Sequence, residues 1–188
     1  MNYVIQDQVD LEKVCSAAAK TPWVGLDTEF QRVRTYYPRL CLLQIATPDL
    51  TICIDALKNL DFSIFKDLLT DSNVTKIFHS ARQDIEALYV AFDVSPAPLF
   101  DTQLAAQLCG YREQISYADL TGKLCSVTLS KDHTRIDWSR RPLSDSEILY
   151  ALDDARYLGP IYHVLMKQLV SLGRDSWISE DCQRLSSL

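Results

Sequence analysis

Short apolar runs separated by turn residues indicate a series of strands in the first half of the chain. Trp23–Leu26 is mostly apolar, as in a strand that is buried on both faces. Two later runs are joined by Thr47-Pro48-Asp49, which predicts a meander of neighbouring strands. The strands expected from these patterns are Tyr3–Ile5, Trp23–Leu26 with the residues that follow it, Leu40–Ala46, Thr51–Asp55 and Val74–Phe78.

Helical periodicity and capping residues dominate the second half. Ser144 and Glu147 have the spacing of a capping box, which predicts the start of a long helix that Pro160 kinks or splits. The weakly periodic stretch Leu129–Arg141 is interpreted as a loop. The other expected helices are one that ends at Lys20 after a cap at Asp7 or Asp10, Phe62–Leu69 after Asp61, Ala81–Phe92, Thr102–Leu108 after Asp101, Tyr117–Leu124 and Asp175–Leu185.

The order of these elements, strands first and then mostly helices, predicts an α/β fold in which a mixed sheet is flanked by helices. No internal repeat or linker interrupts the 188 residues, so a single domain over residues 1–188 is expected. No apolar run approaches the roughly 18 residues of a membrane span. The polar start Met1-Asn2-Tyr3 does not resemble a signal peptide.

Charge and cysteine content narrow the functional classes. The formal net charge of −6 argues against a general nucleic-acid coat protein, since binding phosphates over a broad surface requires positive charge. It is compatible with an enzyme that holds cations in an acidic pocket. The six cysteines are scattered without a Cys-x-x-Cys pair, which favours reduced thiols in a cytoplasmic protein over disulfides or zinc ligands.

Asp27 and Glu29 directly follow the apolar run Trp23–Leu26 and are separated by one residue. Because side chains alternate along a strand, both carboxylates point to the same side. Their mutual repulsion requires a shared proton or a cation, and hard divalent cations such as Mg²⁺ or Mn²⁺ take oxygen ligands. Taken alone, the pair is more simply explained by two solvated acids at a strand end.

Further candidate ligands lie on two predicted helices. Tyr150 and Asp154 are four residues apart on the capped helix, hence on one face. Asp154 could complete a cation site with the first two acids, and Tyr150 could direct its hydroxyl at a water molecule. Packing of Tyr150 and solvation of Asp154 would explain the same spacing without a site. Asp84, within the helix Ala81–Phe92, is either a further ligand or an exposed helix acid.

Basic residues lie before the capped helix. Arg140 and Arg141, together with Lys131, could bind phosphates, although a solvated loop would have the same composition. His79 is interpreted as a structural residue at a strand end rather than as a base. A P-loop and a Gly-x-Ser-x-Gly motif are absent, so the sequence does not support nucleotide hydrolysis or nucleophilic catalysis.

The acidic motifs, taken together and in this order, resemble the tyrosine branch of the DEDD exonuclease superfamily. More closely, the chain resembles the catalytic domain of bacterial ribonuclease D over nearly its whole length. The histidine branch would have a histidine at position 149, where this chain has Leu149. The segments that carry the resemblance are Leu-Asp-Thr-Glu-Phe (26–30), Arg-Thr-Tyr-Tyr-Pro (34–38), Leu-Leu-Gln-Ile (42–45), Phe-Asp-Thr-Gln (100–103), Asp-Trp-Ser-Arg-Arg-Pro-Leu (137–143) and Tyr150-x-x-x-Asp154.

The resemblance implies a ribonuclease-H-like mixed sheet flanked by helices and an enzyme that uses two divalent cations, Mg²⁺ or Mn²⁺. It assigns four acids to these cations, namely Asp27, Glu29, Asp84 and Asp154, and it assigns Tyr150 to the attacking water. The implied reaction removes 5′-mononucleotides from the 3′ ends of single-stranded RNA, such as tRNA precursors, by two-metal hydrolysis. Asp101 is expected to cap a helix rather than to bind a cation.

Substrate contacts are expected from two groups of residues. Phe30, Tyr36 and Gln44 could contact the 3′-terminal nucleotides by stacking and hydrogen bonding. Phosphate contacts are expected from Lys131, Arg140 and Arg141.

The chain departs from ribonuclease D at its end. The family carries helical accessory domains after this one, whereas this chain stops at Leu188, as a cut domain or a short relative would. Two other functions remain open. One is a DNA-directed 3′-5′ exonuclease, because metal sites of this kind do not read the sugar. The other is a catalytically idle nucleic-acid-binding domain, against which the presence of all four acids and Tyr150 argues.

Overall fold

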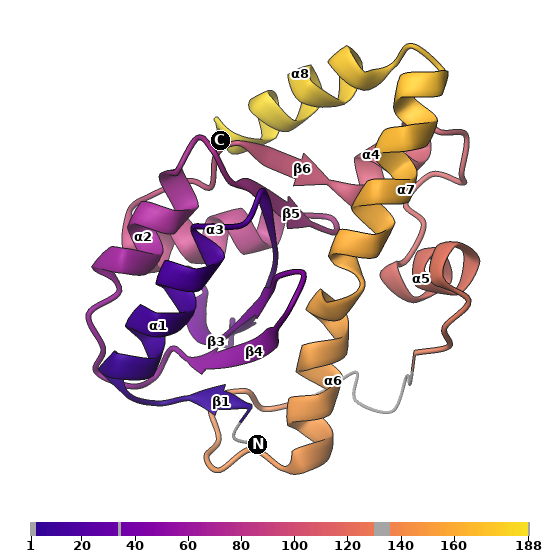
Figure 1. Cartoon of the computed structure of the whole chain (residues 1–188). Coiled ribbons are helices and arrows are strands. Elements are labelled where there is room, and N and C mark those ends of the chain that lie inside the picture. Colours follow the sequence, from indigo (N-terminus) through magenta and orange to yellow (C-terminus); the bar gives the residue numbers. More distant parts are fainter. Residues whose placement is uncertain (1–2, 34, 130–135, 188) are drawn as a thin grey trace.

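The computed structural model describes residues 3–33, 35–129 and 136–187. Within them, six strands form one mixed sheet in the order β1-β4-β3-β2-β5-β6 (Figure 1). The central strands β2, β3 and β4 pair antiparallel, which confirms the predicted meander, while β1, β5 and β6 join in parallel. The strands are β1 (Val4–Ile5), β2 (Trp23–Gln31), β3 (Arg39–Ala46), β4 (Thr51–Asp55), β5 (Thr75–Phe78) and β6 (Leu99–Asp101).

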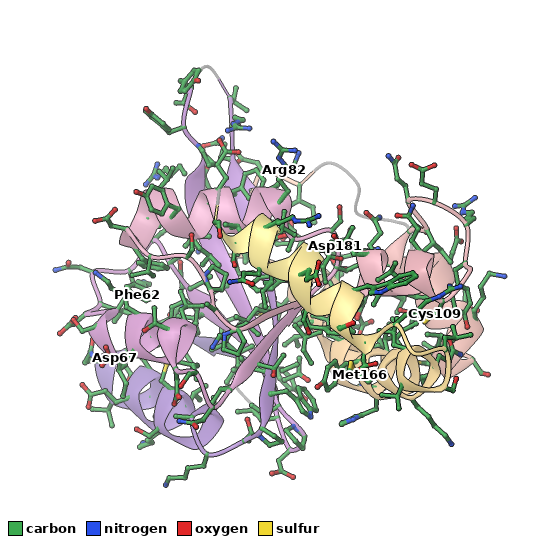
Figure 2. All side chains as sticks on the ribbon, turned by 90° about the horizontal axis from the view of Figure 1, so that it is seen from above. Phe62, Asp67, Arg82, Cys109, Met166 and Asp181 are labelled. Carbon is green, nitrogen blue, oxygen red and sulfur yellow. The ribbon has the colours of Figure 1, made fainter. Side chains whose placement is uncertain are left out.

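Helices flank this sheet, as the order of elements predicted. Helices α6 and α7 follow one another in the chain (Figure 1), and both contact β2. Helix α8, yellow in Figure 2, packs along β6. None of the helices in the described ranges is long and apolar enough to cross a bilayer. The helices are α1 (Gln8–Ala18), α2 (Ser63–Thr70), α3 (Arg82–Phe92), α4 (Thr102–Leu108), α5 (Tyr117–Cys125), α6 (Asp145–Arg156), α7 (Leu158–Ser171) and α8 (Asp175–Ser186).

The α6–α7 pair lies directly on β2 because two glycines leave room for it. A Cβ added at Gly25 would lie 3.0 Å from Leu158 Cβ and 3.3 Å from the carbonyl oxygen of Ala155. A Cβ added at Gly159 would lie only 2.1 Å from the ring of Trp23, so any side chain there would displace the helix. This close contact fixes the height of α6 and α7 above the strand that carries Asp27 and Glu29.

Most local predictions are confirmed. The capping box at Ser144 is formed in both directions, and Asp7 caps α1 by accepting the N–H of Asp10. Asp61 does not occupy the N-cap of α2, which is Phe62, but it accepts from the backbone N–H and the hydroxyl of Ser63. The strand β6 was not predicted, because its three residues are too few to show a periodic pattern.

Candidate metal centre

Three carboxylates from two elements converge above the middle of the sheet. Asp27 and Glu29 project from the same side of β2, and Asp154 reaches them from α6. Each of the three offers a carboxylate oxygen, and these oxygens lie within 4.8 Å of one another. The structure therefore brings together the pair that the strand period predicted and the acid that the helix spacing predicted.

Asp84 lies next to this group but is held differently. It is buried in the first turn of α3, and its Oδ1 accepts hydrogen bonds from the backbone N–H of Thr28 (3.1 Å) and from the Thr28 hydroxyl (2.6 Å). It is not an exposed helix acid. Its charge helps to raise the pKa of both Asp27 and Glu29, so it belongs to the same electrostatic cluster.

Asp101 caps α4, as the sequence predicted, and it also holds the start of α3. Its carboxylate accepts the N–H groups of Gln103 (2.8 Å) and Leu104 (3.3 Å) at the N-terminus of α4. It also accepts those of Ser80 (3.1 Å) and Ala81 (2.8 Å), which immediately precede α3. One buried carboxylate thus fixes the helix end from which Asp84 projects.

The pKa values of all four acids in the cluster are raised. Burial is the largest cause, and it raises the pKa of Asp84 and of Asp154 to about 7. The pKa values of Asp27 and Glu29 are raised well above their usual range, by burial first and then by the charges of their neighbours. In such a site the carboxyls stay protonated unless a positive charge is nearby. This electrostatic behaviour is typical of a site that binds cations.

Tyr150 lies one helical turn before Asp154, and a hydrogen bond links the two side chains, which lowers the pKa of Asp154. Burial, followed by the charge of Asp154, raises the pKa of the Tyr150 phenol. The phenol therefore stays protonated at neutral pH. Its ring stacks on Trp138, with 6.4 Å between ring centroids and 28° between planes. Tyr150 therefore combines a packing contact with a hydroxyl directed at the acids.

The helix that carries Asp154 is interrupted by the hydroxyl of Tyr117. In a continuous helix the N–H of Tyr157 would donate to the carbonyl of Asp153. Instead it donates to the Tyr117 hydroxyl (3.1 Å), besides reaching the carbonyl of Ala155, and the hydroxyl donates to the carbonyl of Asp153 (3.1 Å). A side chain inserted in this way opens the hydrogen-bond ladder and bends the helix.

The break between α6 and α7 consequently falls three residues before Pro160, which the sequence predicted as its cause. Pro160 lacks the N–H that would bond to Arg156, so both residues contribute to the break. The role of Tyr117 had no signal in the sequence, because its partners lie 36 and 40 residues away in the chain. The contact of Thr28 with Asp84 likewise had no signal in the sequence, because it depends on the packing of α3.

Two of the predicted substrate contacts are corrected by the structure. Gln44 is completely buried, so a nucleotide at the surface does not reach it. Arg141 makes a two-pronged ion pair with the buried carboxylate of Asp55, and its remaining N–H groups donate to the backbone carbonyls of Cys41, Trp138 and Arg140. Its guanidinium is therefore committed to anchoring the loop before α6 and has no donor left for a phosphate.

The other predicted contacts lie in different surroundings. Arg140 binds both carboxylate oxygens of Glu147 but keeps about half of its side chain exposed. Phe30 is partly buried against the core, whereas Tyr36 is 85% exposed and packs edge-to-face on Tyr37. Lys131 lies outside the described residues. His79 is a structural residue, as interpreted from the sequence, because its ring bonds to the Thr102 hydroxyl and the Ile115 carbonyl.

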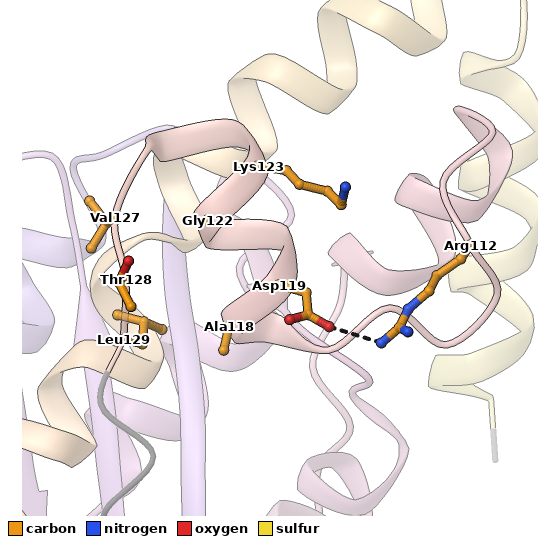
Figure 3. Close-up of a pocket in the computed structure, with 8 residues that line it drawn as sticks. All are labelled: Arg112, Ala118, Asp119, Gly122, Lys123, Val127, Thr128 and Leu129. Atoms are coloured by element: carbon orange, nitrogen blue, oxygen red, sulfur yellow. Dashed lines mark hydrogen bonds and ion pairs between the residues drawn. The ribbon is translucent and has the colours of Figure 1, made fainter.

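A separate cavity of about 510 Å³ lies beside α5 (Figure 3). The ion pair between Arg112 and Asp119 lies at this cavity, and Lys123 also lines it. Its described lining residues include none of the four acids, so this cavity is separate from the acidic cluster.

The donor set suits hard divalent cations. All four candidate ligands are carboxylates, and their crowding is costly without positive charge. In addition, both polar side-chain atoms of buried Gln44, which lies opposite Asp27 in the sheet, find no hydrogen-bond partner among the described residues. An orphaned amide beside an acidic cluster is consistent with a site that is completed by a ligand.

Comparison with known proteins agrees with this geometry. A family model described as 3′-5′ exonuclease matches residues 2–170. Ribonuclease D from Bartonella henselae is 41% identical over 96% of this chain and 45% of that protein. Ribonuclease D from Jannaschia sp. is 40% identical over 100% of this chain and 50% of that protein. The chain thus spans about half the length of the curated relatives it matches.

Solved structures are similar over the whole fold. The crystal structure of Escherichia coli RNase D, described as an exoribonuclease involved in structured RNA processing, matches with a TM-score of 0.95 and 35% identity, over 100% of this chain and 50% of that chain. Brucella melitensis NrnC matches with a TM-score of 0.82 and 26% identity, over 99% and 88% of the two chains. Further structures show NrnC bound to pGG and with bound Mg²⁺.

The raised pKa values predict how the stability of the metal-free protein depends on pH. Unfolded carboxyls titrate near pH 4, whereas those of Asp84 and Asp154 titrate at about 7 in the folded protein. Between these values the folded state binds more protons than the unfolded chain, so the free energy of unfolding falls as pH rises. In thermal unfolding experiments with EDTA, the acidic cluster should therefore lower the Tm by several degrees between pH 5 and pH 8.

The variant Asp27→Asn isolates this contribution. His79, whose pKa is lowered by burial, acts in the opposite direction over part of the same range, so the difference between the two proteins is the informative quantity. Asp27→Asn should have a higher Tm than the unchanged protein in EDTA, and the gap should widen with pH. A gap that is constant from pH 5 to pH 8 would show that the cluster does not titrate as described.

Tyr117→Phe tests whether the hydroxyl sets the position of Asp154. It keeps the ring but removes the bridge between Tyr157 and Asp153, so α6 can extend and carry Asp154 away from Asp27. We expect a loss of about 1 kcal/mol in stability and an affinity for Mn²⁺, measured by calorimetry, that is lower by severalfold. Tyr111→Phe is the matched control, since the Tyr111 hydroxyl accepts only a hydrogen bond from Gln168. Equal Mn²⁺ affinity in both variants would contradict this role.

Proposed function

The chain belongs to the 3′-5′ exonuclease family, and from that premise we propose that it shortens single-stranded RNA from the 3′ end and releases 5′-mononucleotides. The observation that carries this proposal is the convergence of Asp27, Glu29 and Asp154 within 4.8 Å, with Asp84 beside them and the Tyr150 hydroxyl on Asp154. Four crowded carboxylates with raised pKa values need positive charge, and two divalent cations would supply it.

The residues of this chain have distinct tasks in the proposed reaction. Asp27, Glu29, Asp84 and Asp154 would hold the cations, Mg²⁺ or Mn²⁺, which when bound stabilise the charge that develops in an in-line displacement at phosphorus. Water forms a bond to the phosphorus of the last nucleotide and the P–O3′ bond to the preceding nucleotide breaks. One proton of the water is released, and the leaving O3′ takes up a proton to become the new 3′ hydroxyl.

Tyr150 is proposed to orient the attacking water. Its raised pKa keeps the phenol protonated, so it acts through a hydrogen bond and not as a general base. The bond to Asp154 and the contact with Trp138 hold the hydroxyl in place before substrate arrives. This preorganisation keeps the water aligned with the P–O3′ bond that breaks.

RNA is the proposed substrate because the relatives named ribonuclease D include one described as an exoribonuclease involved in structured RNA processing. Binding of pGG and of Mg²⁺ by NrnC supports a short nucleotide and Mg²⁺ as ligands here. Within the chain, Phe30 and Tyr36 are proposed to contact bases and Arg140 to contact a phosphate. A cytoplasmic location is proposed because all six cysteines are free thiols.

Asp154→Asn tests the reaction directly. The unchanged protein should shorten 5′-labelled single-stranded RNA in single-nucleotide steps with Mg²⁺ or Mn²⁺, and EDTA should stop it. Asp154→Asn should be slower by about 10²–10⁴, because one ligand of the cations is lost. Asp153→Asn is the matched control on the same helix, because the Asp153 side chain pairs with Arg156 instead of the cluster. It should stay within a few-fold of the unchanged protein.

The same assay separates the alternative functions. Single-stranded DNA of the same sequence, shortened faster than RNA, would identify a DNA-directed exonuclease. Binding of RNA without shortening under any metal would identify an idle binding domain. Near-normal turnover by Asp154→Asn would end the two-metal proposal.

Tyr150→Phe tests the water-orienting role. It keeps the ring and its contact with Trp138 but deletes the hydroxyl. Turnover should fall more than tenfold, while Mn²⁺ affinity and Tm change little. If activity fell only in proportion to a loss of stability, Tyr150 would be a packing residue and the proposed role would be wrong.

A further inference from the structure

Gln44 is a polar residue in an apolar strand. It lies near the end of β3 between Leu43 and Ile45, and all three side chains are buried. Neither its Nε2 nor its Oε1 has a hydrogen-bond partner within the described ranges, a state that Gln44 shares there with the hydroxyl of Thr121. Burying an unpaired amide costs about 1–3 kcal/mol, so an aliphatic residue of similar size would serve packing better.

The register of the sheet places this amide beside the acids. Gln44 pairs directly with Asp27 on one side and with Cys53 on the other. Residues directly opposite each other in antiparallel strands point to the same face, with Cβ atoms about 4.5–5.5 Å apart. The thiol of Cys53 has a pKa raised by burial and further by the charges of Glu29 and Asp27, so this row of side chains does face the cluster.

The space around the amide is otherwise closed. Cys53 and Leu42 pack with Ala151 and Leu152 of α6, which cover this face of the sheet. Along its row of the sheet, Gln44 thus lies between Cys53 of this largely apolar cluster and Asp27, which carries the carboxylate. A carboxylate oxygen accepts a hydrogen bond from an amide N–H such as that of Gln44 Nε2.

We propose that Gln44 is a positioning residue for the cation site: its Nε2 donates a hydrogen bond to the carboxylate of Asp27, its partner in the sheet, when that carboxylate holds a cation. The bond fixes the carboxylate so that its other oxygen faces the cation. Groups of this kind behind a ligand hold it in orientation and tune its affinity for the metal. The inference rests on the proposed function, since it needs Asp27 to be a cation ligand. It also gives the otherwise unpaired Gln44 amide a partner.

Gln44→Met separates this role from packing. Methionine has nearly the same length and no amide, so it should raise Tm in EDTA by removing an unpaired polar group. The affinity for Mn²⁺, measured by calorimetry without RNA, should fall about tenfold, as for other residues behind metal ligands. The kcat for RNA should fall while KM stays within twofold, because Gln44 does not reach the substrate. Gln44→Leu gives a second readout if Gln44→Met does not fold.

Thr121→Val is the matched control. It removes the other unpaired buried polar group, on α5, and should raise Tm in EDTA without changing Mn²⁺ affinity. If Gln44→Met binds Mn²⁺ as tightly as the unchanged protein and the control, the proposal is overturned, whatever happens to stability. If the unchanged protein itself binds no Mn²⁺, the proposed function fails first, so the two failures are distinguishable.

Discussion

Carboxylates gathered in a poorly solvated recess are the constraint on which the rest of this structure depends. Asp27, Glu29, Asp84 and Asp154 each have a raised pKa, because burial and neighbouring charges both disfavour ionisation. Left to itself, such a cluster would relax by separating its members or by admitting water. The fold prevents the separation, since each acid is carried by an element that is fixed by contacts elsewhere in the molecule.

The contacts that fix these elements are mostly hydrogen bonds to backbone groups. Asp101 holds the start of α3 through two N–H groups and the start of α4 through two more, and the Tyr117 hydroxyl holds α6 where it breaks from α7. Arg141 joins the loop before α6 to Asp55 at the end of β4. Because these bonds join parts of the chain itself, they would organise the acids independently of any ligand, and the binding energy of a cation would not be spent on ordering the chain.

The sequence predicted the parts of this arrangement that are local. A strand period places Asp27 beside Glu29, a helical turn places Tyr150 beside Asp154, and a capping box starts α6 at Ser144. The resemblance to ribonuclease D joined these pieces into one site. What could not be predicted is set by distant packing: the Tyr117 insertion, the Thr28 contact with Asp84, and the three-residue strand β6.

Arg140 and Arg141 show why residue type alone is a poor guide to substrate contacts. The two are adjacent, identical in chemistry and equally suited to phosphate, yet one side chain remains about half exposed while the other is mostly buried on Asp55. A buried carboxylate must be paired, so Asp55 requires a cationic partner regardless of any substrate. Gln44 is the converse case, a buried polar group without a partner in the described part of the chain. In a core that pairs Asp55 so completely, the unpaired amide opposite Asp27 is better explained by the proposed hydrogen bond to that carboxylate than by a fault in packing.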